Sequence, residues 1–334
     1  RSPPTVVGAS ELPPRPPTML LVILALGGTS ALRPEEKLVE KLAELVGQDH
    51  SLHAPVISLK RALVSPAESA DATPVVFMHG MGDAGPNPGM QSLARSVSEM
   101  YPQKYSIAVS VADGLASILE PMDRQLLEFA KAVRADPKLA KGFDAVGLSQ
   151  GNLLVRAYIE RINDPPVRRF VSICGPHAGI GTCPANPVYQ LICPIWKLDK
   201  YGAGIAFSDY WKGVTDRTDY LAHNGFLPDI NNERPGIKNQ TYVDNMLKLE
   251  KYALVQAVWD TMLVPRETSQ FGFWPWGAEY GGIVPMEKSE GYKSDWIGLR
   301  TLDETGRLKK LEFVGDHLQF TSEWWSANIL PIFA

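Results

Sequence analysis

The chain has 334 residues, of which 45% are hydrophobic and 9% aromatic, and 33 Lys and Arg against 37 Asp and Glu give a formal net charge of −4. This length allows one large α/β domain or two ordinary domains, and the apolar content is sufficient for a substantial core. No block of like charge occurs, which argues against a nucleic-acid-binding protein and against disorder beyond the ends.

The N-terminal region has the pattern of an export signal. Several prolines occur in residues 1–18, the apolar run 19–26 follows, and small residues occupy 27–31. Such a run is typical of a secretory signal peptide cleaved after Ala31 and is too short to span a bilayer, although a buried strand is the alternative. We therefore assign 1–31 to a signal peptide and upstream residues, with Met19 as a candidate initiator.

Residues 32–73 are predicted to precede the catalytic domain. An amphipathic helix is expected over 34–46, with a proline at its start and Gly47 at its end. The small, polar segment 65–73 indicates a linker. No chemistry is assigned to this region.

The strand predicted at 74–80 leads into a glycine-rich loop with two interpretations. Gly80, Gly82 and Gly85 match the dinucleotide fingerprint G-x-G-x-x-G, which would indicate a dehydrogenase. That fingerprint should open a helix directly, whereas Pro86-Asn87-Pro88 delays the helix to about residue 89. In a serine hydrolase, the same loop directs a backbone N–H toward the reacting oxygen.

A serine motif follows two further predicted elements, a strand at 105–111 and a helix at 118–134. Gly147, Ser149 and Gly151 form G-x-S-x-G between the apolar run 145–148 and a helical pattern at 152–162. The motif requires this strand–serine–helix context, because the small residues permit a strained turn that exposes the hydroxyl. With a further strand at 167–174, the alternation of strands and helices predicts a parallel sheet.

The remaining residues are expected to form a cap insertion, two further strands and a closing helix. Residues 175–245 are rich in proline, glycine and aromatics and are predicted to form a cap insertion able to hold a long acyl chain. Strands are predicted at 255–260 and 308–314, the latter preceded by a hairpin turn at 303–306, and a closing helix at 323–330.

Ser149, Asp260 and His317 occur in the chain order of the α/β hydrolase triad. A serine hydroxyl is a poor nucleophile at its own pKa, so His317 must remove its proton, while Asp260 orients the imidazole.

Rivals exist for two of these roles. Asp316 is an alternative acid, but neighbours in sequence rarely face each other, so Asp260 is preferred over it as the partner of His317. The alternative bases are His79, close to the presumed oxyanion loop, and His177 and His223, both in the cap region.

Three cysteines are present, Cys174, Cys183 and Cys193. No C-x-x-C pair occurs and the six histidines are scattered, so a zinc site is not predicted. Cys183 and Cys193 lie in a Pro-rich loop and are close enough in sequence for a local disulfide if the protein is exported. Cys174 ends an apolar run and is expected to be a buried thiol.

Five separated blocks together resemble the palmitoyl-protein thioesterases, a family of α/β hydrolases, over about residues 74–334. The blocks are 77–83 (FMHGMGD), 147–151 (GLSQG), 229–234 (DINNER), 271–273 (FGF) and 315–319 (GDHLQ).

The resemblance implies that Ser149 is the nucleophile, Asp260 the acid and His317 the base. It also implies an oxyanion hole built from the backbone N–H groups of Met81 and Gln150, a Cys183–Cys193 disulfide, and a glycan on Asn239, which begins the chain's one N-x-[ST] sequon. Ala84-Gly85 replace adjacent cysteines of the family, another family disulfide has no counterpart, and Asn152 stands where a glycine is usual.

The sequence therefore predicts an α/β hydrolase domain over 74–334, with a mostly parallel central sheet flanked by helices. We expect an exported, lysosomal or vacuolar serine hydrolase that removes long-chain acyl groups from cysteine thioesters of S-acylated proteins or peptides. We expect no cofactor, metal, nucleic-acid partner or stable membrane span, and a monomer. The alternatives are an oxygen-ester lipase or esterase of the same fold and a non-catalytic lipid-binding protein.

Overall fold

The computed structural model describes residues 72–184, 193–194, 200–201 and 204–334. The predicted signal peptide at 1–31 and the predicted helix at 34–46 lie outside the described residues. So does nearly all of the linker that was expected to end at residue 73.

A six-stranded sheet forms the centre of the described chain, and its strand order is β2-β1-β3-β4-β5-β6. Every neighbouring pair is parallel, which confirms the predicted parallel sheet. Both β1 and β3 are buried along their whole length, because helices cover both faces and the strands are correspondingly apolar. The strands are β1 (Val75–Met78), β2 (Ser106–Val109), β3 (Phe143–Leu148), β4 (Val167–Ile173), β5 (Lys251–Ala257) and β6 (Leu308–Phe313).

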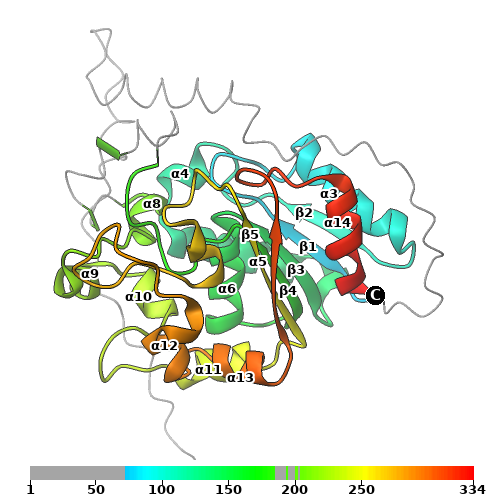
Figure 1. The fold of residues 1–334 in the computed structure, drawn as a ribbon. Helices are drawn as coiled ribbons and strands as arrows, with labels where there is room; N and C mark the ends of the chain where they lie inside the picture. The colour runs from blue at the N-terminus through cyan, green and yellow to red at the C-terminus, as the bar shows by residue number, and fades with distance from the viewer. Residues whose placement is uncertain (1–71, 185–192, 195–199, 202–203) are drawn as a thin grey trace, which may run out of the picture.

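Helices cover the sheet on two sides (Figure 1). On one side, α3 (Pro88–Met100) and α14 (Ser322–Asn328) are joined where the Trp325 indole donates to Ser96 Oγ at 2.9 Å, and Trp325 packs against Phe77 of β1. On the other side, α6 (Gly151–Arg161) packs against β3 and β1, and α5 (Met122–Ala135) packs against α6. The flanked sheet predicted from the sequence is therefore confirmed.

Prolines set two of the helix boundaries. Helix α3 begins at Pro88, which lacks an N–H that the first turn would leave unpaired anyway. The single helix predicted over 118–134 is wrong: the structure has α4 (Ala116–Leu119) and α5, with Pro121 between them. Pro121 has no N–H to continue the hydrogen-bond ladder of α4, so the first helix ends before it.

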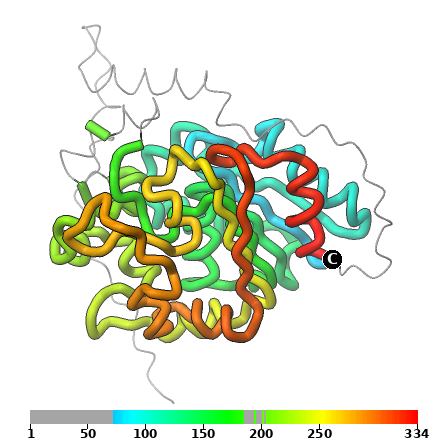
Figure 2. Tube along the Cα trace, viewed as in Figure 1, coloured from blue at the N-terminus to red at the C-terminus, as the bar shows by residue number. Residues whose placement is uncertain are grey.

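Two long, irregular segments connect strands of the sheet and lie close together at one end of the molecule (Figures 1 and 2). The first connects β4 to β5, covers the predicted cap region and contains α8 (Ala206–Asp209), α9 (Arg217–His223), α10 (Leu227–Ile230) and α11 (Gln240–Met246). The second connects β5 to β6 and contains η3 (Arg266–Gln270), η4 (Met286–Lys288), α12 (Glu290–Lys293) and α13 (Leu299–Glu304). Two short helices, η2 (Pro137–Leu139) and η5 (Leu330–Phe333), complete the described elements.

The hairpin expected before β6 is wrong. Residues 303–304 end α13, and β6 pairs in parallel with β5, not with a preceding antiparallel strand. The Asp-Glu-Thr-Gly sequence suits a helix end as well as a hairpin, because Gly306 adopts a positive φ of 69° just after the helix.

The strand order places a topological switch point at the carboxyl ends of β1 and β3. The chain leaves β1 toward β2 on one side and leaves β3 toward β4 on the other, so the loops after these two strands diverge. Ligands bind at such a switch point in open α/β sheets. The glycine-rich loop and Ser149 follow β1 and β3 respectively.

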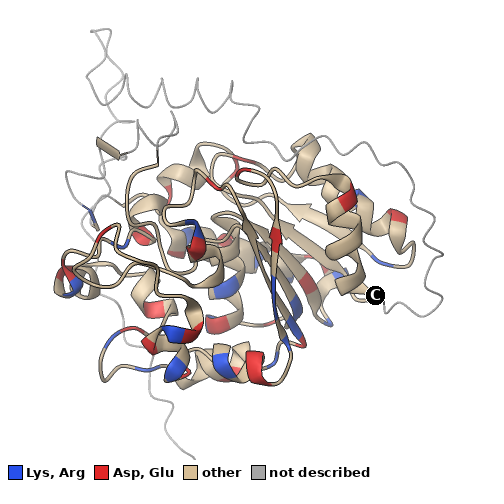
Figure 3. Ribbon diagram, in the orientation of Figure 1, with Lys and Arg blue, Asp and Glu red and all other residues tan. Residues whose placement is uncertain are grey.

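The described chain carries charged residues of both signs. Acidic and basic residues are interspersed over the helices in Figure 3. A search of the described residues finds no helix with the length and apolar character needed to cross a bilayer.

Candidate active site

Ser149 occupies a strained turn between β3 and α6. Its φ is 50°, a left-handed value that is uncommon for a residue with a side chain. The backbone N–H of Ser149 donates to the Ile173 carbonyl at the end of β4, at 3.0 Å. The turn is thus held by the neighbouring strand, and it presents the hydroxyl at the switch point.

The two glycines of the motif are required by packing. A Cβ on Gly147 would lie 2.7 Å from Asn152 Cα, and one on Gly151 would lie 2.6 Å from the Met78 carbonyl oxygen. Both contacts are with backbone atoms, which cannot move aside cheaply. The α6 helix can therefore approach β1 and β3 only with glycine at these positions.

Asn152, which replaces the usual glycine, adds a hydrogen-bonded tie to the turn. Its side-chain Nδ2 donates to the carbonyl of Ser149 at 2.9 Å and to that of Ile173 at 2.8 Å. Asn152 is fully buried. The substitution thus links the serine turn to β4.

The structure brings Ser149, Asp260 and His317 together. His317 Nε2 lies 2.9 Å from Ser149 Oγ, and His317 Nδ1 lies 2.7 Å from Asp260 Oδ2. The other carboxylate oxygen of Asp260 accepts the backbone N–H groups of Met262 (2.9 Å) and Leu263 (2.8 Å), which fix its orientation. This geometry allows His317 to accept the serine proton while Asp260 stabilises the imidazolium.

Asp316 faces away from the ring of His317. One of its oxygens accepts the backbone N–H groups of Thr261 (2.8 Å) and His317 (2.7 Å), and both accept the Thr261 hydroxyl. Asp316 thereby joins the two loops that carry Asp260 and His317.

The three rival histidines are bound elsewhere. His79 Nε2 lies 3.0 Å from Asp113 Oδ1, and exposed His223 is paired with Asp219 at 2.8 Å. His177 is fully buried, with Nε2 lying 2.6 Å from Ser172 Oγ. None of the three contacts Ser149.

Two backbone N–H groups near Ser149 have no protein acceptor within the described part of the chain. They belong to Met81, in the loop after β1, and to Gln150, at the start of α6. Both residues are buried, with 8% and 2% of their surfaces exposed. Donors of this kind, at a helix N-terminus and in a facing loop, are suited to stabilising a developing oxyanion.

Cys174 lies close to the Asp260–His317 pair. Its Sγ, one carboxylate oxygen of Asp260 and one ring nitrogen of His317 all lie within 4.8 Å of one another. Both nitrogens of His317 and both oxygens of Asp260 are already engaged. Burial and the adjacent Asp260 carboxylate raise the pKa of the Cys174 thiol well above its ordinary value. A metal here would need the Cys174 sulfur as a thiolate and would have to replace the existing hydrogen bonds of His317 and Asp260.

Cys183 and Cys193 form a disulfide in the segment after β4, with their Cα atoms 6.3 Å apart. Asn239 is exposed and is the N-cap of α11, where its Oδ1 accepts the Thr241 N–H at 3.1 Å. Its amide nitrogen is left on the surface.

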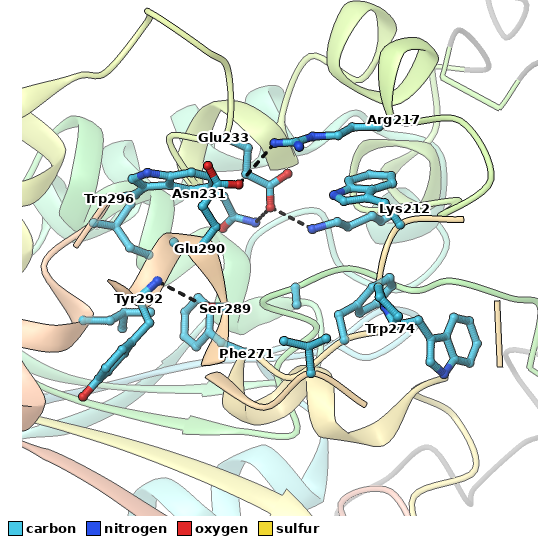
Figure 4. Close-up of a pocket in the computed structure, with 18 of the residues that line it drawn as sticks. Lys212, Arg217, Asn231, Glu233, Phe271, Trp274, Ser289, Glu290, Tyr292 and Trp296 are labelled. Carbon is cyan, nitrogen blue, oxygen red and sulfur yellow. Dashed lines mark hydrogen bonds and ion pairs between the residues drawn. The ribbon is translucent and has the colours of Figure 1, made fainter. Parts of the chain in front are cut away.

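A cavity of about 200 Å³ lies apart from the triad, between the two irregular segments (Figure 4). Its walls include Phe273, Trp274 and Trp276. Its charged groups are already paired: Lys212 with Glu233 at 2.8 Å, and Arg217 with Glu290 at 3.5 Å. The Arg217–Glu290 pair joins the two segments, whereas Lys212 and Glu233 both belong to the β4–β5 segment.

The residues that support the Met81 loop and the start of α6, beside Ser149, were not predicted from the sequence. Tyr210 contacts both Met81 and Gln150, and Ser117 contacts Gln150 and Gly82, the residue after Met81. Tyr210 was predicted only as one of many cap aromatics, and no motif marks Ser117. Their proximity depends on tertiary packing that short-range patterns do not encode.

Comparison with known proteins gives a consistent result. A family model described as palmitoyl protein thioesterase matches residues 74–317. Palmitoyl-protein thioesterase 3 of Dictyostelium discoideum is 37% identical over 257 residues, covering 76% of this chain and 86% of the relative. Palmitoyl-protein thioesterase 1 of Caenorhabditis elegans is 34% identical over 273 residues, covering 77% and 91%.

More distant similarities extend to other thioesterases and esterases. A human protein named lysosomal thioesterase PPT2 is 26% identical over 268 residues, covering 76% of this chain and 84% of that protein. Among solved structures, an arylesterase is 14% identical with a TM-score of 0.43, covering 91% of this chain and 90% of that one.

Proposed function

The chain belongs to the palmitoyl protein thioesterase family and is a thioester hydrolase with the α/β hydrolase fold, and we propose that it uses Ser149 to remove long-chain acyl groups from cysteine side chains of proteins or peptides. The observation that carries the assignment of the nucleophile is the unbroken chain of contacts from Ser149 Oγ through His317 to Asp260, at 2.9 and 2.7 Å. Such a chain activates a hydroxyl that is otherwise a weak nucleophile.

In the first half of the reaction, Ser149 Oγ attacks the thioester carbonyl while His317 Nε2 accepts the serine proton. The N–H groups of Met81 and Gln150 stabilise the oxyanion. The C–S bond then breaks, the departing sulfur takes the proton from His317 Nε2 and leaves as a thiol, and the acyl group remains on Ser149 as an ester. The leaving thiol has an ordinary pKa of about 8.5, so it departs with less help from a proton donor than an amine would need.

In the second half, water attacks the acyl-enzyme and gives its proton to His317. The carbonyl again becomes an oxyanion in the same hole, and its collapse breaks the ester bond. The proton returns to Ser149, and the fatty acid is released.

We place this activity in the secretory pathway, in a lysosome, vacuole or secreted fluid. Three features support this location: relatives named lysosomal thioesterases, the Cys183–Cys193 disulfide, and the exposed Asn239 of the sequon. If Asn239 carries a glycan, peptide N-glycosidase will increase the gel mobility of the wild type made in eukaryotic cells but not that of Asn239→Gln. An identical mobility change in both proteins would contradict this site.

The function is tested with an S-palmitoyl cysteine peptide and the matched O-palmitoyl serine peptide, each given to the wild type and to Ser149→Ala. We expect the wild type to cleave the thioester faster than the ester, and the variant to cleave neither. Faster cleavage of the oxygen ester would indicate a lipase or esterase of the same fold. Full activity in the variant would contradict the role of Ser149.

A further inference from the structure

The two residues that supply the free N–H groups near Ser149 are braced by one side chain from the β4–β5 segment. The hydroxyl of Tyr210 donates to Gln150 Oε1 at 3.0 Å, and the Tyr210 hydroxyl oxygen also lies 3.6 Å from Met81 Sδ. Tyr210 is 1% exposed. One buried hydroxyl therefore touches both halves of the proposed oxyanion hole.

A second brace comes from Ser117, in α4. Its carbonyl accepts Gln150 Nε2 at 2.8 Å, and its hydroxyl accepts the backbone N–H of Gly82, next to Met81, at 2.7 Å. Gln125 of α5 accepts the same Gln150 amide at 3.1 Å. The Gln150 side chain thus has partners for both its oxygen and its nitrogen.

The position of Tyr210 is itself fixed by its segment. Its backbone carbonyl accepts the Ile180 N–H at 3.0 Å, and its ring meets Phe207 edge-on, with 5.6 Å between centroids. Just before it, Asp209 accepts the Met122 N–H at the start of α5 at 2.7 Å. These contacts hold the phenol against the main body of the fold.

We propose that Tyr210 is a positioning residue that fixes the spacing of the Met81 and Gln150 N–H groups for the transition state. This inference rests on the proposed role of Ser149 and goes beyond it. An oxyanion hole accelerates reaction because its donors are already aimed at the oxygen before charge develops. Without the hydroxyl of Tyr210, the Met81 loop and the start of α6 lose one of the contacts that they share, and Gln150 Oε1 is left buried without that donor.

The test compares Tyr210→Phe with Tyr220→Phe, a matched loss of one hydroxyl from another fully buried tyrosine of the same segment. The buried Tyr220 hydroxyl has no hydrogen-bond partner among the described residues, Met81 and Gln150 included. We expect kcat for an S-palmitoyl peptide to fall about 10-fold in Tyr210→Phe, less than the 10²- to 10³-fold loss that follows removal of a donor itself. KM should stay close to that of the wild type, and Tyr220→Phe should keep its kcat.

Two inhibitors separate positioning from general structural damage. A hexadecyl trifluoromethyl ketone adds to the nucleophilic serine and forms an oxyanion, whereas an S-hexadecyl cysteine peptide is an uncleaved thioether with no such charge. Tyr210→Phe should weaken ketone binding by about the same factor as kcat/KM, because both depend on the oxyanion. Thioether binding should not change.

The proposal is overturned if Tyr210→Phe retains wild-type kcat and ketone affinity, or if both inhibitors weaken equally. If Tyr210→Phe does not fold, Gln150→Met provides the second test, because it keeps the backbone N–H and removes the acceptor of Tyr210. It should show the same selective loss of ketone binding, and equal loss of both inhibitors would overturn the proposal. If Ser149→Ala binds the ketone as tightly as the wild type, the nucleophile itself is misassigned and both proposals fail.

Discussion

Two histidines among the described residues lie within hydrogen-bond distance of a serine, and only one of these two sites has the features of a catalytic centre. His317 lies 2.9 Å from Ser149 Oγ, and His177 lies 2.6 Å from Ser172 Oγ. The shorter contact belongs to the second pair. Proximity of a histidine to a serine therefore does not identify a nucleophile.

The pairs differ at the other ring nitrogen. His317 Nδ1 faces the Asp260 carboxylate at 2.7 Å, whereas His177 Nδ1 is buried and has no hydrogen-bond partner among the described residues. Burial, and next the positive charge of Arg156, lower the pKa of His177 well below its ordinary value. The surroundings of His177 therefore oppose its protonation, and of these two histidines only His317 has a carboxylate at its second ring nitrogen.

The pairs also differ in access and in backbone geometry. Ser149 has a φ of 50° at the carboxyl end of β3, while Ser172 lies inside β4 and is fully buried. The His177 ring stacks on Phe271, with 4.7 Å between centroids. The second pair thus joins β4 to the β5–β6 segment, and a substrate has no route to it through the described packing.

The largest expected difference between the two pairs is in kcat when each serine hydroxyl is removed in turn. Ser149→Ala should lower kcat for an S-palmitoyl peptide by about 10⁶-fold, the loss seen when the nucleophile of a comparable triad is removed. Ser172→Ala should retain wild-type kcat per folded molecule. Steady-state kinetics normalised to the folded fraction provide the measurement, and a large loss in Ser172→Ala alone would reverse our assignment.

The next effect concerns the two neighbouring carboxylates. Asp260→Asn should lower kcat by about 10⁴-fold, because the amide no longer favours the required tautomer and imidazolium of His317. Asp316→Asn is the matched control and should lose far less, since Asp316 contacts only Thr261 and the His317 backbone. Equal losses measured under saturating substrate would contradict the division of roles.

The second histidine should matter for stability and not for turnover. His177→Phe leaves the Ser172 hydroxyl buried without its imidazole partner, which should reduce the free energy of unfolding by about 1–3 kcal/mol. Urea unfolding followed by tryptophan fluorescence measures this loss. A fall in kcat of the folded fraction, with unchanged stability, would place His177 in the chemistry.

The smallest effect is a pH dependence in the same buried region. Burial raises the pKa of Glu160 to about 8, although Arg156 opposes the shift. The native state then binds a proton more tightly than the unfolded state, whose carboxyl has its ordinary pKa near 4.5. Glu160 should therefore make the protein less stable as pH rises from about 4.5 to about 8.

Replacing this carboxyl should flatten that dependence. Thermal unfolding of Glu160→Gln should show a smaller fall in Tm across the interval than the wild type. Glu128→Gln, at an exposed site on α5, should leave the wild-type slope unchanged. An unchanged slope in Glu160→Gln would show that Glu160 is ionised across the whole interval.

Much of the catalytic framework could be predicted because it depends on short, local patterns. Gly147 and Gly151 identify the serine turn, since the backbone packing there tolerates no side chain. Sequence patterns located the six strands of the described sheet, although β5 (Lys251–Ala257) begins and ends earlier than the strand predicted at 255–260, so that Asp260 lies in the loop after it. The order of Ser149, Asp260 and His317 predicted residues that the fold brings together.

Other features depend on contacts between distant segments and left no such pattern. The hydrogen bond between Tyr210 and Gln150 joins residues 60 positions apart. The buried contacts of Asn231, in one of the five blocks, reach back to Arg156 in α6, with 2.7 Å between the atoms. The helix end before Pro121 and the parallel pairing of β6 were not predicted, because the helix and turn patterns were interpreted without the tertiary contacts of those segments.

The central claim is that Ser149 is the nucleophile, and covalent labelling tests it most directly. The wild type is treated with a hexadecyl fluorophosphonate, and the adduct is located by peptide mass mapping while thioesterase activity is followed. We predict one adduct, on Ser149, with activity lost in proportion to labelling. Activity lost through an adduct on another residue, or full activity after complete labelling of Ser149, would contradict the account.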